Sequence, residues 1–415
     1  MNIESECWMD RDIEYTWKLR WVVISIGFFV MMVISIYQYS WSLFAYSLAQ
    51  EFKWDFATIG LTFTVFVYTA TFIQPFSGYI ADSFGPRKVS VLASLMVGLG
   101  FLLSSSASSP GQLYFYYGLG GIGVGILYGL STASAIKWFP DKRGFATGLV
   151  VFGFGAGTAI FNWMIQGSLE ANGFRTTLQY LGLLMLGVLV PASFFYKFPP
   201  PQWMPPAKQG DSKRVSLSMD YKPAAMLRTC NWYLIYFCFA FTVSIVLLFG
   251  AQMKMVAKEY HLPKKYFDVL LVIFPLGNGL SRIVSGAVSD RLGREKTMVF
   301  FYTCLGLSIL ALLIFGSHPF LFVTIVFISA LLGGAPFALY PATIGDYYGS
   351  KYSTVNYGIT YTAKAWAGLI SGWLSGYFVS KMGSYKIPLV IIAVCSLLAA
   401  LFSNPRIMKS PQKKG

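Results

Sequence analysis

The sequence is poor in charge, and poorest in acidic residues. Only 12% of its 415 residues are charged, and 17 Asp and Glu stand against 32 Lys and Arg. A soluble domain carries about a quarter charged residues, so this composition excludes an ordinary soluble protein. Because 55% of the residues are hydrophobic, the chain is typical of a polytopic membrane protein.

Residues that perform metal and acid–base chemistry are also scarce. The five cysteines form no Cys-x-x-Cys spacing, and the two histidines fall outside the apolar runs. A disulfide framework is therefore not expected. Since the apolar runs hold no His, Asp or Glu in their interior, we expect no metal, no cofactor and no enzymatic activity.

The chain does contain many long apolar runs. Runs of about 20 residues recur, which is the length needed to cross a bilayer core of about 30 Å. The first twenty residues are too polar for a signal peptide, so the first run should stay as a membrane helix. Twelve spans are predicted, at residues 21–46, 57–80, 89–108, 112–136, 145–167, 177–198, 231–256, 268–288, 297–316, 320–345, 357–380 and 387–404.

The Lys and Arg residues are unevenly distributed between the loops. If both termini are cytoplasmic, 22 of the 32 fall on the cytoplasmic side and eight on the outer side. This asymmetry follows the positive-inside rule. The net charge of +15 is therefore an orientation signal and does not indicate nucleic-acid binding, with anionic membrane lipids as secondary partners. We expect a multi-pass protein of the cell membrane with both termini in the cytoplasm.

Two loops share one motif at a constant separation. GYIADSFGPRKV at 78–89 matches GAVSDRLGREKT at 286–297, with an offset of 208 residues. Residues 198–223 between the two halves are rich in proline and charge, which indicates a surface linker. The predicted segments are a cytoplasmic segment 1–20, a six-helix bundle 21–198, a linker 199–230, a second six-helix bundle 231–404 and a basic tail 405–415.

This repeat predicts an all-α membrane protein with twelve transmembrane helices in two pseudo-symmetric six-helix bundles. Repeated halves of this kind are typical of alternating-access transporters, which bind substrate between the halves near the midplane.

The repeated motif resembles the cytoplasmic gate motif of the major facilitator superfamily. A glycine permits close helix contact, and an Asp at a helix end can accept hydrogen bonds from a neighbouring helix and pair with Arg, which would close the cytoplasmic side in one state. The alternative is that these charges only fix the topology. The matching residues are Gly78, Asp82, Gly85, Arg87 and Lys88 in the first copy, and Gly286, Asp290, Arg291, Gly293, Arg294 and Lys296 in the second.

Two cations lie deep inside apolar runs. Arg282 is eight residues before Asp290, and Lys364 is eight residues after Asn356, which places both about 12 Å from the cytoplasmic ends of their helices. A cation at such a depth costs about 2.5–3.5 kcal/mol or more. Either each side chain reaches the interface or an internal carboxylate pairs with it, but the apolar runs supply no such carboxylate. We therefore predict that Arg282 and Lys364 bind an anionic substrate.

The N-terminal half offers neutral polar partners for such an anion. Amides and phenols donate hydrogen bonds to carboxylate oxygens, and these bonds strengthen where aromatic walls exclude water. Each of these residues could instead serve only packing. The candidates are Gln38, Tyr39, Gln74 and Tyr128.

Several stretches resemble the oxalate/formate antiporter family, which is close to the monocarboxylate transporters. They include IYQYSWSLF at 36–44, KWFPDKRGFATG at 137–148 and NYGITYTAKAWAG at 356–368. The resemblance implies that the family's intramembrane Arg and Lys are Arg282 and Lys364, and that its polar pocket comprises Gln38, Tyr39, Gln74 and Tyr128. Tyr361, Gly333 and Phe337 stand where oxalate-handling relatives carry Trp, Trp and Tyr, which implies an altered aromatic cage with room for a larger monocarboxylate.

The predicted function is secondary transport of small organic carboxylates, of the oxalate/formate or lactate/pyruvate class, by a monomer. Two like charges make an empty site unfavourable to occlude, which favours anion exchange. Proton-coupled monocarboxylate symport is the alternative, with Lys364 as the group that releases the proton. In the resemblance, the proton-coupled transporters carry an Asp where this chain has Asn278. A non-transporting membrane receptor for carboxylates is the alternative from another class.

Overall fold

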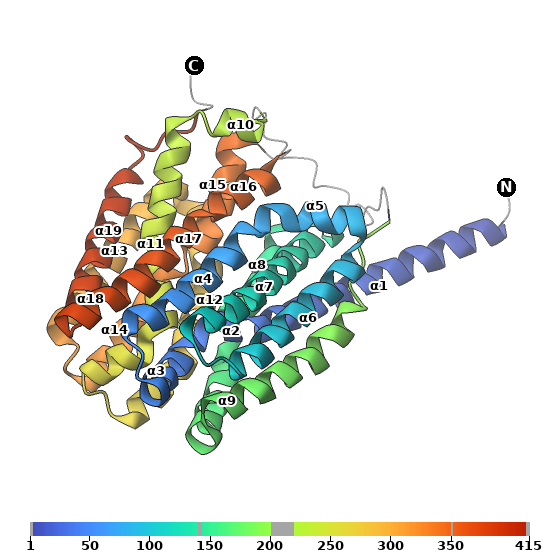
Figure 1. Cartoon of the computed structure of the whole chain (residues 1–415). Coiled ribbons are helices and arrows are strands. Elements are labelled where there is room, and N and C mark those ends of the chain that lie inside the picture. The colour runs from blue at the N-terminus through green and yellow to red at the C-terminus, as the bar shows by residue number, and fades with distance from the viewer. Residues whose placement is uncertain (1–2, 140–142, 201–219, 350–351, 412–415) are drawn as a thin grey trace.

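The computed structural model describes residues 3–139, 143–200, 220–349 and 352–411, and these residues form helices and connecting turns without any strand. The N-half, defined here as α1 to α9, lies beside the C-half, defined as α10 to α19 (Figure 1). The N-half comprises α1 (Ile3–Ile34), α2 (Ile36–Tyr39), α3 (Trp41–Phe52), α4 (Phe56–Phe72), α5 (Gln74–Phe84), α6 (Pro86–Ser105), α7 (Pro110–Trp138), α8 (Arg143–Ala156) and α9 (Thr158–Ser193).

The C-half has the same alternation of long and broken helices. It comprises α10 (Pro223–Met226), α11 (Cys230–Glu259), α12 (Lys264–Leu292), α13 (Arg294–Phe315), α14 (Pro319–Gly333), α15 (Pro336–Tyr348), α16 (Ser353–Tyr361), α17 (Ala363–Leu369), the π-helical turn η1 (Ile370–Leu374), α18 (Ser375–Met382) and α19 (Lys386–Phe402).

These helices account for the predicted spans. Nine helical stretches of the described chain are long and apolar enough to cross a membrane. One of them, Phe145–Ser193, supplies two passes because Gly173 has a φ of 75° and the chain turns back there. The broken helix from α16 to α18 and the shorter apolar helix α19 supply the remaining passes. The predicted all-α architecture of two six-helix bundles is confirmed.

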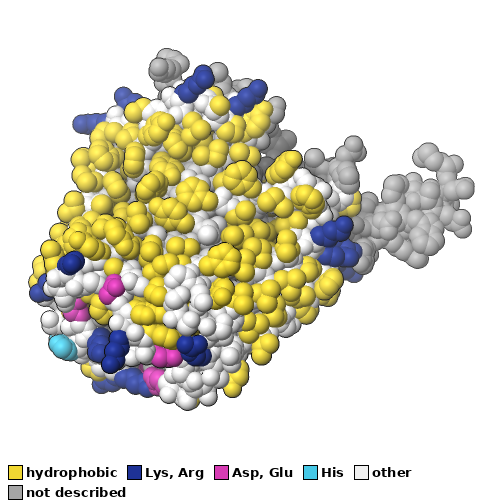
Figure 2. Space-filling model, in the orientation of Figure 1, with side chains coloured by type: hydrophobic (Ala, Val, Ile, Leu, Met, Phe, Trp, Pro, Cys, Tyr) yellow, Lys and Arg dark blue, Asp and Glu magenta, His cyan; other side chains and the backbone are white. Residues whose placement is uncertain are grey.

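The surface agrees with a protein embedded in lipid. On the face in Figure 2, hydrophobic side chains form a broad band, and charged side chains lie mainly toward its two ends. Large apolar side chains such as Phe115, Trp163 and Ile314 are about 70% exposed. A soluble surface rarely exposes a contiguous apolar area of this extent, whereas a membrane requires it.

The two ends of the bundle differ in the turns that they carry. The motif side carries the turns at Gly85 and Gly293, where both repeated motifs leave one helix and enter the next. The far side carries the turns after α3, α6, α11, α13 and α18. Both motif glycines have positive φ, 86° and 90°, a backbone conformation that favours glycine.

Several spans are interrupted near their middle, which the sequence analysis did not predict. Ser35 and Thr362 donate from their hydroxyls to the carbonyls of residues three positions earlier, at 2.6 Å in each case. Such bonds compete with the helix ladder and bend helices. Pro75 and Pro336 interrupt two other spans, because proline lacks an N–H and clashes with the preceding turn. The helix that carries the first span, α1, begins at Ile3, whereas the apolar span itself begins at Lys18, three residues before the predicted start at residue 21.

Candidate substrate site

Arg282 lies in the interior, on α12, and only 5% of it is exposed. Its guanidinium carbon lies 4.8 Å from the centre of the Phe337 ring. One terminal nitrogen donates to the backbone carbonyl of Val151 in α8, which belongs to the opposite half. Nε is buried and has no hydrogen-bond partner among the residues that the structure describes. In the described part of the chain, no carboxylate lies within ion-pair distance of this guanidinium.

Lys364 lies in the first turn of α17 and is 4% exposed. Its ammonium donates to Oε1 of Gln38 at 2.7 Å and to the hydroxyl of Tyr361 at 3.3 Å. Among the described residues it also lacks an ion-pair partner. Because Gln38 belongs to the N-half, the Lys364–Gln38 hydrogen bond joins the two halves at the centre of the molecule.

Gln38 supplies the second unsatisfied donor of this region. It lies in the short helix α2 and is completely buried, and its Nε2 has no partner among the described residues. A buried donor without an acceptor is costly and rare in a folded protein. The unpartnered Nε2 of Gln38 and Nε of Arg282 can both donate to a ligand that carries acceptor oxygens.

Aromatic rings enclose the two cations. The Phe154 ring centre lies 5.8 Å from the Lys364 ammonium. Tyr128 and Tyr361 lie 5.8 Å apart between ring centres, and Tyr361 lies 6.3 Å from Phe337. Tyr39 packs on the edge of Phe154 at 5.7 Å. We call Arg282, Lys364, Gln38 and these rings the central site. Its walls come from both halves and are almost entirely buried, which strengthens electrostatic interactions inside it.

The structure brings most of the predicted substrate-binding residues together, through pairings that the sequence analysis did not predict, and their role in binding stays a prediction. Arg282, Lys364, Gln38, Tyr39, Tyr128, Tyr361 and Phe337 are all buried and are linked by the contacts above. Gln74 differs, because it is only half-buried at the start of α5 and its side chain makes no hydrogen bond among the described residues.

Two residues near the central site were missed as partners. Asn278 lies one helical turn before Arg282, and its Nδ2 donates to the Tyr39 hydroxyl at 2.9 Å. Phe154 contacts both Tyr39 and Lys364. The repeat gave a usable signal for Phe154, since a near-repeat offset of 210 residues relates it to Lys364.

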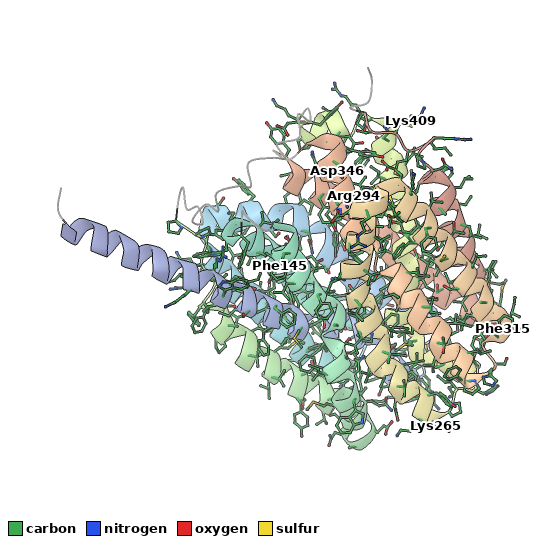
Figure 3. All side chains as sticks on the ribbon, turned by 180° about the vertical axis from the view of Figure 1, so that it is seen from behind. Phe145, Lys265, Arg294, Phe315, Asp346 and Lys409 are labelled. Carbon is green, nitrogen blue, oxygen red and sulfur yellow. The ribbon has the colours of Figure 1, made fainter. Side chains whose placement is uncertain are left out.

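The second copy of the repeated motif forms a charged cluster within the C-half. Arg294 pairs with Asp290 at 2.7 Å and with Asp346, at the end of α15, at 3.0 Å. Figure 3 shows Arg294 beside Asp346, toward the end of the bundle opposite Lys265. The cluster therefore braces three helices of one half in this conformation, and its role as a gate between the halves stays a prediction.

The other residues of the two motif copies give less support to the predicted gate role. Arg87, Lys88, Arg291 and Lys296 are exposed on the motif side. A side-chain carbon added at Gly286 would meet nothing within 4 Å, so the prediction of close helix contact at this glycine is wrong for this conformation. Gly78 and Asp82 lie in α5, and the surroundings of both residues are outside the described part of the structure.

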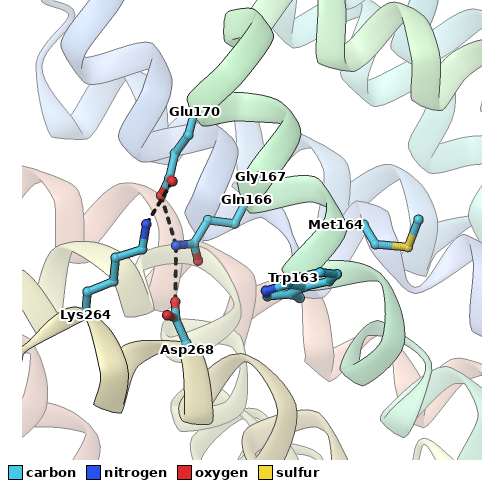
Figure 4. A pocket seen from close by; sticks show the side chains of 7 residues that line it. All are labelled: Trp163, Met164, Gln166, Gly167, Glu170, Lys264 and Asp268. Carbon is cyan, nitrogen blue, oxygen red and sulfur yellow. Dashed lines mark hydrogen bonds and ion pairs between the residues drawn. The ribbon is translucent and has the colours of Figure 1, made fainter.

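A second polar cluster joins the halves on the far side. Lys264 of α12 pairs with Glu170 of α9 at 2.9 Å. Gln166 donates from Nε2 to Glu170 at 3.0 Å and to Asp268 at 3.2 Å. These bonds border a cavity of about 290 Å³, called here the far-side pocket (Figure 4). Its lining residues are Trp163, Met164, Gln166, Gly167, Glu170, Lys264 and Asp268.

Known proteins share the architecture of this chain. A family model described as Major Facilitator Superfamily matches residues 23–250 and 232–414. The chain belongs to the Major Facilitator Superfamily. Its fold resembles the inward open conformation of the xylose transporter XylE from E. coli, with a TM-score of 0.74 over 95% of this chain and 98% of that one. At 13% identity, this likeness shows the fold alone.

Relatives within the superfamily are closer in sequence. An "Oxalate:formate antiporter" from Oxalobacter formigenes is 32% identical over 95% of this chain and 94% of its own length. A "Probable sulfoacetate transporter SauU" from Cupriavidus necator is 25% identical over 96% and 97% of the two chains. The predicted resemblance to the oxalate/formate antiporter family is confirmed. The chain is a multi-pass membrane protein and a secondary transporter with a small-molecule substrate.

Proposed function

We propose that this protein exchanges small organic carboxylates across the cell membrane and binds them between Arg282 and Lys364. The observation that carries the proposal is the pair of buried cations whose described surroundings hold no carboxylate. A buried cation normally requires an anionic partner. In an exchanger the substrate is that partner. The relative named as an oxalate:formate antiporter supports this class of substrate.

The two cations would bind a carboxylate in different ways. The guanidinium of Arg282 is a planar fork that can hold both oxygens of one carboxylate. The ammonium of Lys364 is a point charge on a flexible chain, and in this structure it donates to Gln38 and Tyr361. A substrate oxygen can replace Gln38 as its acceptor. A dicarboxylate can contact both cations at once, whereas a monocarboxylate leaves one positive charge in the site.

This arrangement favours exchange over net transport. Closing the empty site brings two unneutralised cations into a low-dielectric interior, which is unfavourable. A bound anion removes part of that cost, so the loaded protein should pass between its two conformations faster than the empty one. Reorientation that requires a bound anion on every passage produces one-for-one exchange.

The orientation in the membrane is also part of the proposal. Most Lys and Arg residues outside the spans lie on the motif side, which favours a cytoplasmic location for that side and for both termini. The far side is then the outer surface. The bundle boundaries at 21–198 and 231–404 and the monomeric state likewise stay predictions.

Transport by purified protein in liposomes tests the proposal. Vesicles are loaded with or without unlabelled oxalate, formate, lactate or pyruvate, and uptake of the labelled compound is followed with and without a pH gradient. We expect rapid uptake only into vesicles loaded with a carboxylate. Uptake into empty vesicles that follows the pH gradient would show proton symport instead. Binding without any uptake would favour a receptor.

A further inference from the structure

A third cation lies between the central site and the far side without an ion pair. Lys254 is on α11, five residues before the helix ends at Glu259. Its side chain is partly buried, and its ammonium lies 4.8 Å from the ring centre of Tyr46 and 5.9 Å from that of Phe267. Within the described residues it makes neither a hydrogen bond nor an ion pair. The sequence analysis counted it among the outer-side charges.

Lys254 lies one turn beyond the wall of the central site. Gly250 precedes it by four residues, so both occupy the same face of α11, about 6 Å apart along the helix axis. A side-chain carbon added at Gly250 would lie 3.2 Å from the backbone oxygen of Gln38 and 3.5 Å from the Tyr39 ring. Gly250 therefore contacts the wall of the central site, and Lys254 is the next residue on that face toward the far side.

Tyr46 covers this lysine from the other half of the molecule. Tyr46 lies on α3 of the N-half, whereas Lys254 and Lys258 lie on α11 of the C-half. Lys258 donates to the Tyr46 hydroxyl at 3.3 Å, and its ammonium lies 5.2 Å from the ring centre. Because the contact joins the two halves, separating them on the far side removes Tyr46 and uncovers Lys254, whereas Lys258 is exposed already.

The same separation changes the charge balance of the far side. Glu170 is on the N-half and leaves with it, while Lys264 and Asp268 stay on the C-half with Lys254 and Lys258. The C-half wall of the opened route would then carry three lysines and one carboxylate. A route with a net positive wall attracts anions and raises their local concentration.

We propose that Lys254 is a carboxylate-binding residue on the far-side route to the central site, covered by Tyr46 when that route is closed. This inference rests on the proposed function, because its ligand is the same class of small carboxylate. The substrate would bind Lys254 transiently and then pass to Arg282 and Lys364. A residue that served only to pack against Tyr46 would not need a charge, since an apolar side chain contacts a ring without the cost of desolvating an ammonium group.

The test compares the two sides of the membrane. The concentration of carboxylate that half-saturates exchange (KM) is measured from the far side in intact cells and from the motif side in inside-out vesicles. For Lys254→Gln we expect the far-side KM to rise about fivefold or more and to depend less on salt, with the motif-side KM unchanged. Lys254→Arg should retain most of the wild-type behaviour. The control is Lys265→Gln, which removes an exposed lysine that contacts only its neighbour Tyr266 among the described residues.

Tyr46→Leu separates this proposal from a purely structural contact. If Lys254 only holds the far side closed through the Tyr46 ring, both Lys254→Gln and Tyr46→Leu will favour the far-side-open conformation and lower the far-side KM, and the proposal is overturned. If Lys254 binds substrate, Lys254→Gln will raise the far-side KM, whereas Tyr46→Leu will leave it unchanged or lower it. Equal changes in KM on both sides, or none, in Lys254→Gln would also overturn it. Lys254→Met repeats the comparison with an apolar side chain if the glutamine variant does not fold.

These outcomes are distinct from failure of the proposed function. Wild-type protein that moves no carboxylate in liposomes rejects the exchange proposal before any variant is made. Wild-type exchange combined with an unaltered far-side KM in Lys254→Gln rejects only the role of Lys254.

Discussion

The central site and the far-side pocket both join the two halves of the protein, but they handle charge in opposite ways. In the central site, Lys364 and Arg282 reach across to neutral acceptors of the N-half, Gln38 and the Val151 carbonyl. In the far-side pocket, Lys264 pairs with the Glu170 carboxylate across the same boundary. The connection at the central site has two positive charges that bond only neutral acceptors among the described residues. The connection at the far-side pocket pairs one positive charge with one negative charge.

The difference has an energetic consequence. Solvent-exposed ion pairs contribute little, because water screens both charges. Buried cations without an anion carry a much larger desolvation cost. We therefore expect ligand binding at the central site to control passage between conformations, while the far-side pocket adjusts the balance between them. Variants that remove each connection in turn test whether the central site has the larger effect.

The largest effect should follow from removing the guanidinium of the central site. Arg282→Gln deletes the group proposed to hold a substrate carboxylate, and loss of one partner of a buried charged pair costs about 2–5 kcal/mol. We expect exchange to fall about thirtyfold or more. Arg282→Lys keeps the charge but loses the two-oxygen geometry, so it should also be impaired, though less.

The control for this prediction is Lys381→Gln, which removes an exposed cation from the last turn of α18. Labelled exchange in liposomes and the amount of folded protein are measured for all three variants. Exchange at the wild-type rate by Arg282→Gln would show that Arg282 does not bind the substrate.

A smaller effect is expected where helices of the two halves touch on the far side. The backbone of α4 approaches η1 so closely that a side-chain carbon at Gly372 would lie 2.5 Å from Thr64 Oγ1 and 2.6 Å from the Gly60 carbonyl oxygen. Gly372→Ala must push the helices apart, and overpacking of this kind costs about 1–3 kcal/mol. We expect the far side to open more often, seen as faster hydrogen exchange in α4 and η1.

The matched control is Gly187→Ala in α9, where an added carbon meets nothing within 4 Å. This variant should leave hydrogen exchange in α4 unchanged, because alanine only favours the helix there. Unaltered hydrogen exchange in Gly372→Ala would mean that the two helices adjust without separating.

The sequence singled out the two buried cations of the central site more readily than the hydrogen bonds around them, for a physical reason. Arg282 and Lys364 were conspicuous because a cation in an apolar run without a nearby acid needs a special explanation. The hydrogen bond from Arg282 to the Val151 carbonyl and the one from Asn278 to the Tyr39 hydroxyl could not be predicted in the same way, since only the crossing of distant helices brings these residues together.

The sequence analysis also did not predict the helix interruptions near the central site or the position of Lys254 beneath the Tyr46 ring. A serine or proline interrupts a span only if neighbouring helices satisfy the freed backbone groups, which a single sequence does not reveal. Lys254 was missed because a lysine near a predicted span end was taken as a surface charge, whereas the structure places it beneath Tyr46.

The smallest effect should come from the balanced pair of the far-side pocket. Glu170→Gln or Lys264→Gln removes the ion pair between the halves, and exposed pairs of this kind change an equilibrium by a factor of about five at most. We expect each variant to favour the far-side-open conformation slightly, and more clearly at low salt than at high salt. Hydrogen exchange around the Gly173 turn of α9 and in the first turns of α12 measures the shift.

The charge-swapped double variant Glu170→Lys with Lys264→Glu should restore most of the wild-type behaviour, because the pair is re-formed with the charges exchanged. Gln166 can rotate its amide and accept from the new lysine at position 170. The matched control is Glu51→Gln, which removes the 3.6 Å pair between Glu51 and Arg175 inside the N-half. That pair does not join the halves, so its loss should leave the opening of the far side unchanged. If Glu51→Gln and Glu170→Gln open the far side equally, charge balance across the pocket does not set the conformational equilibrium.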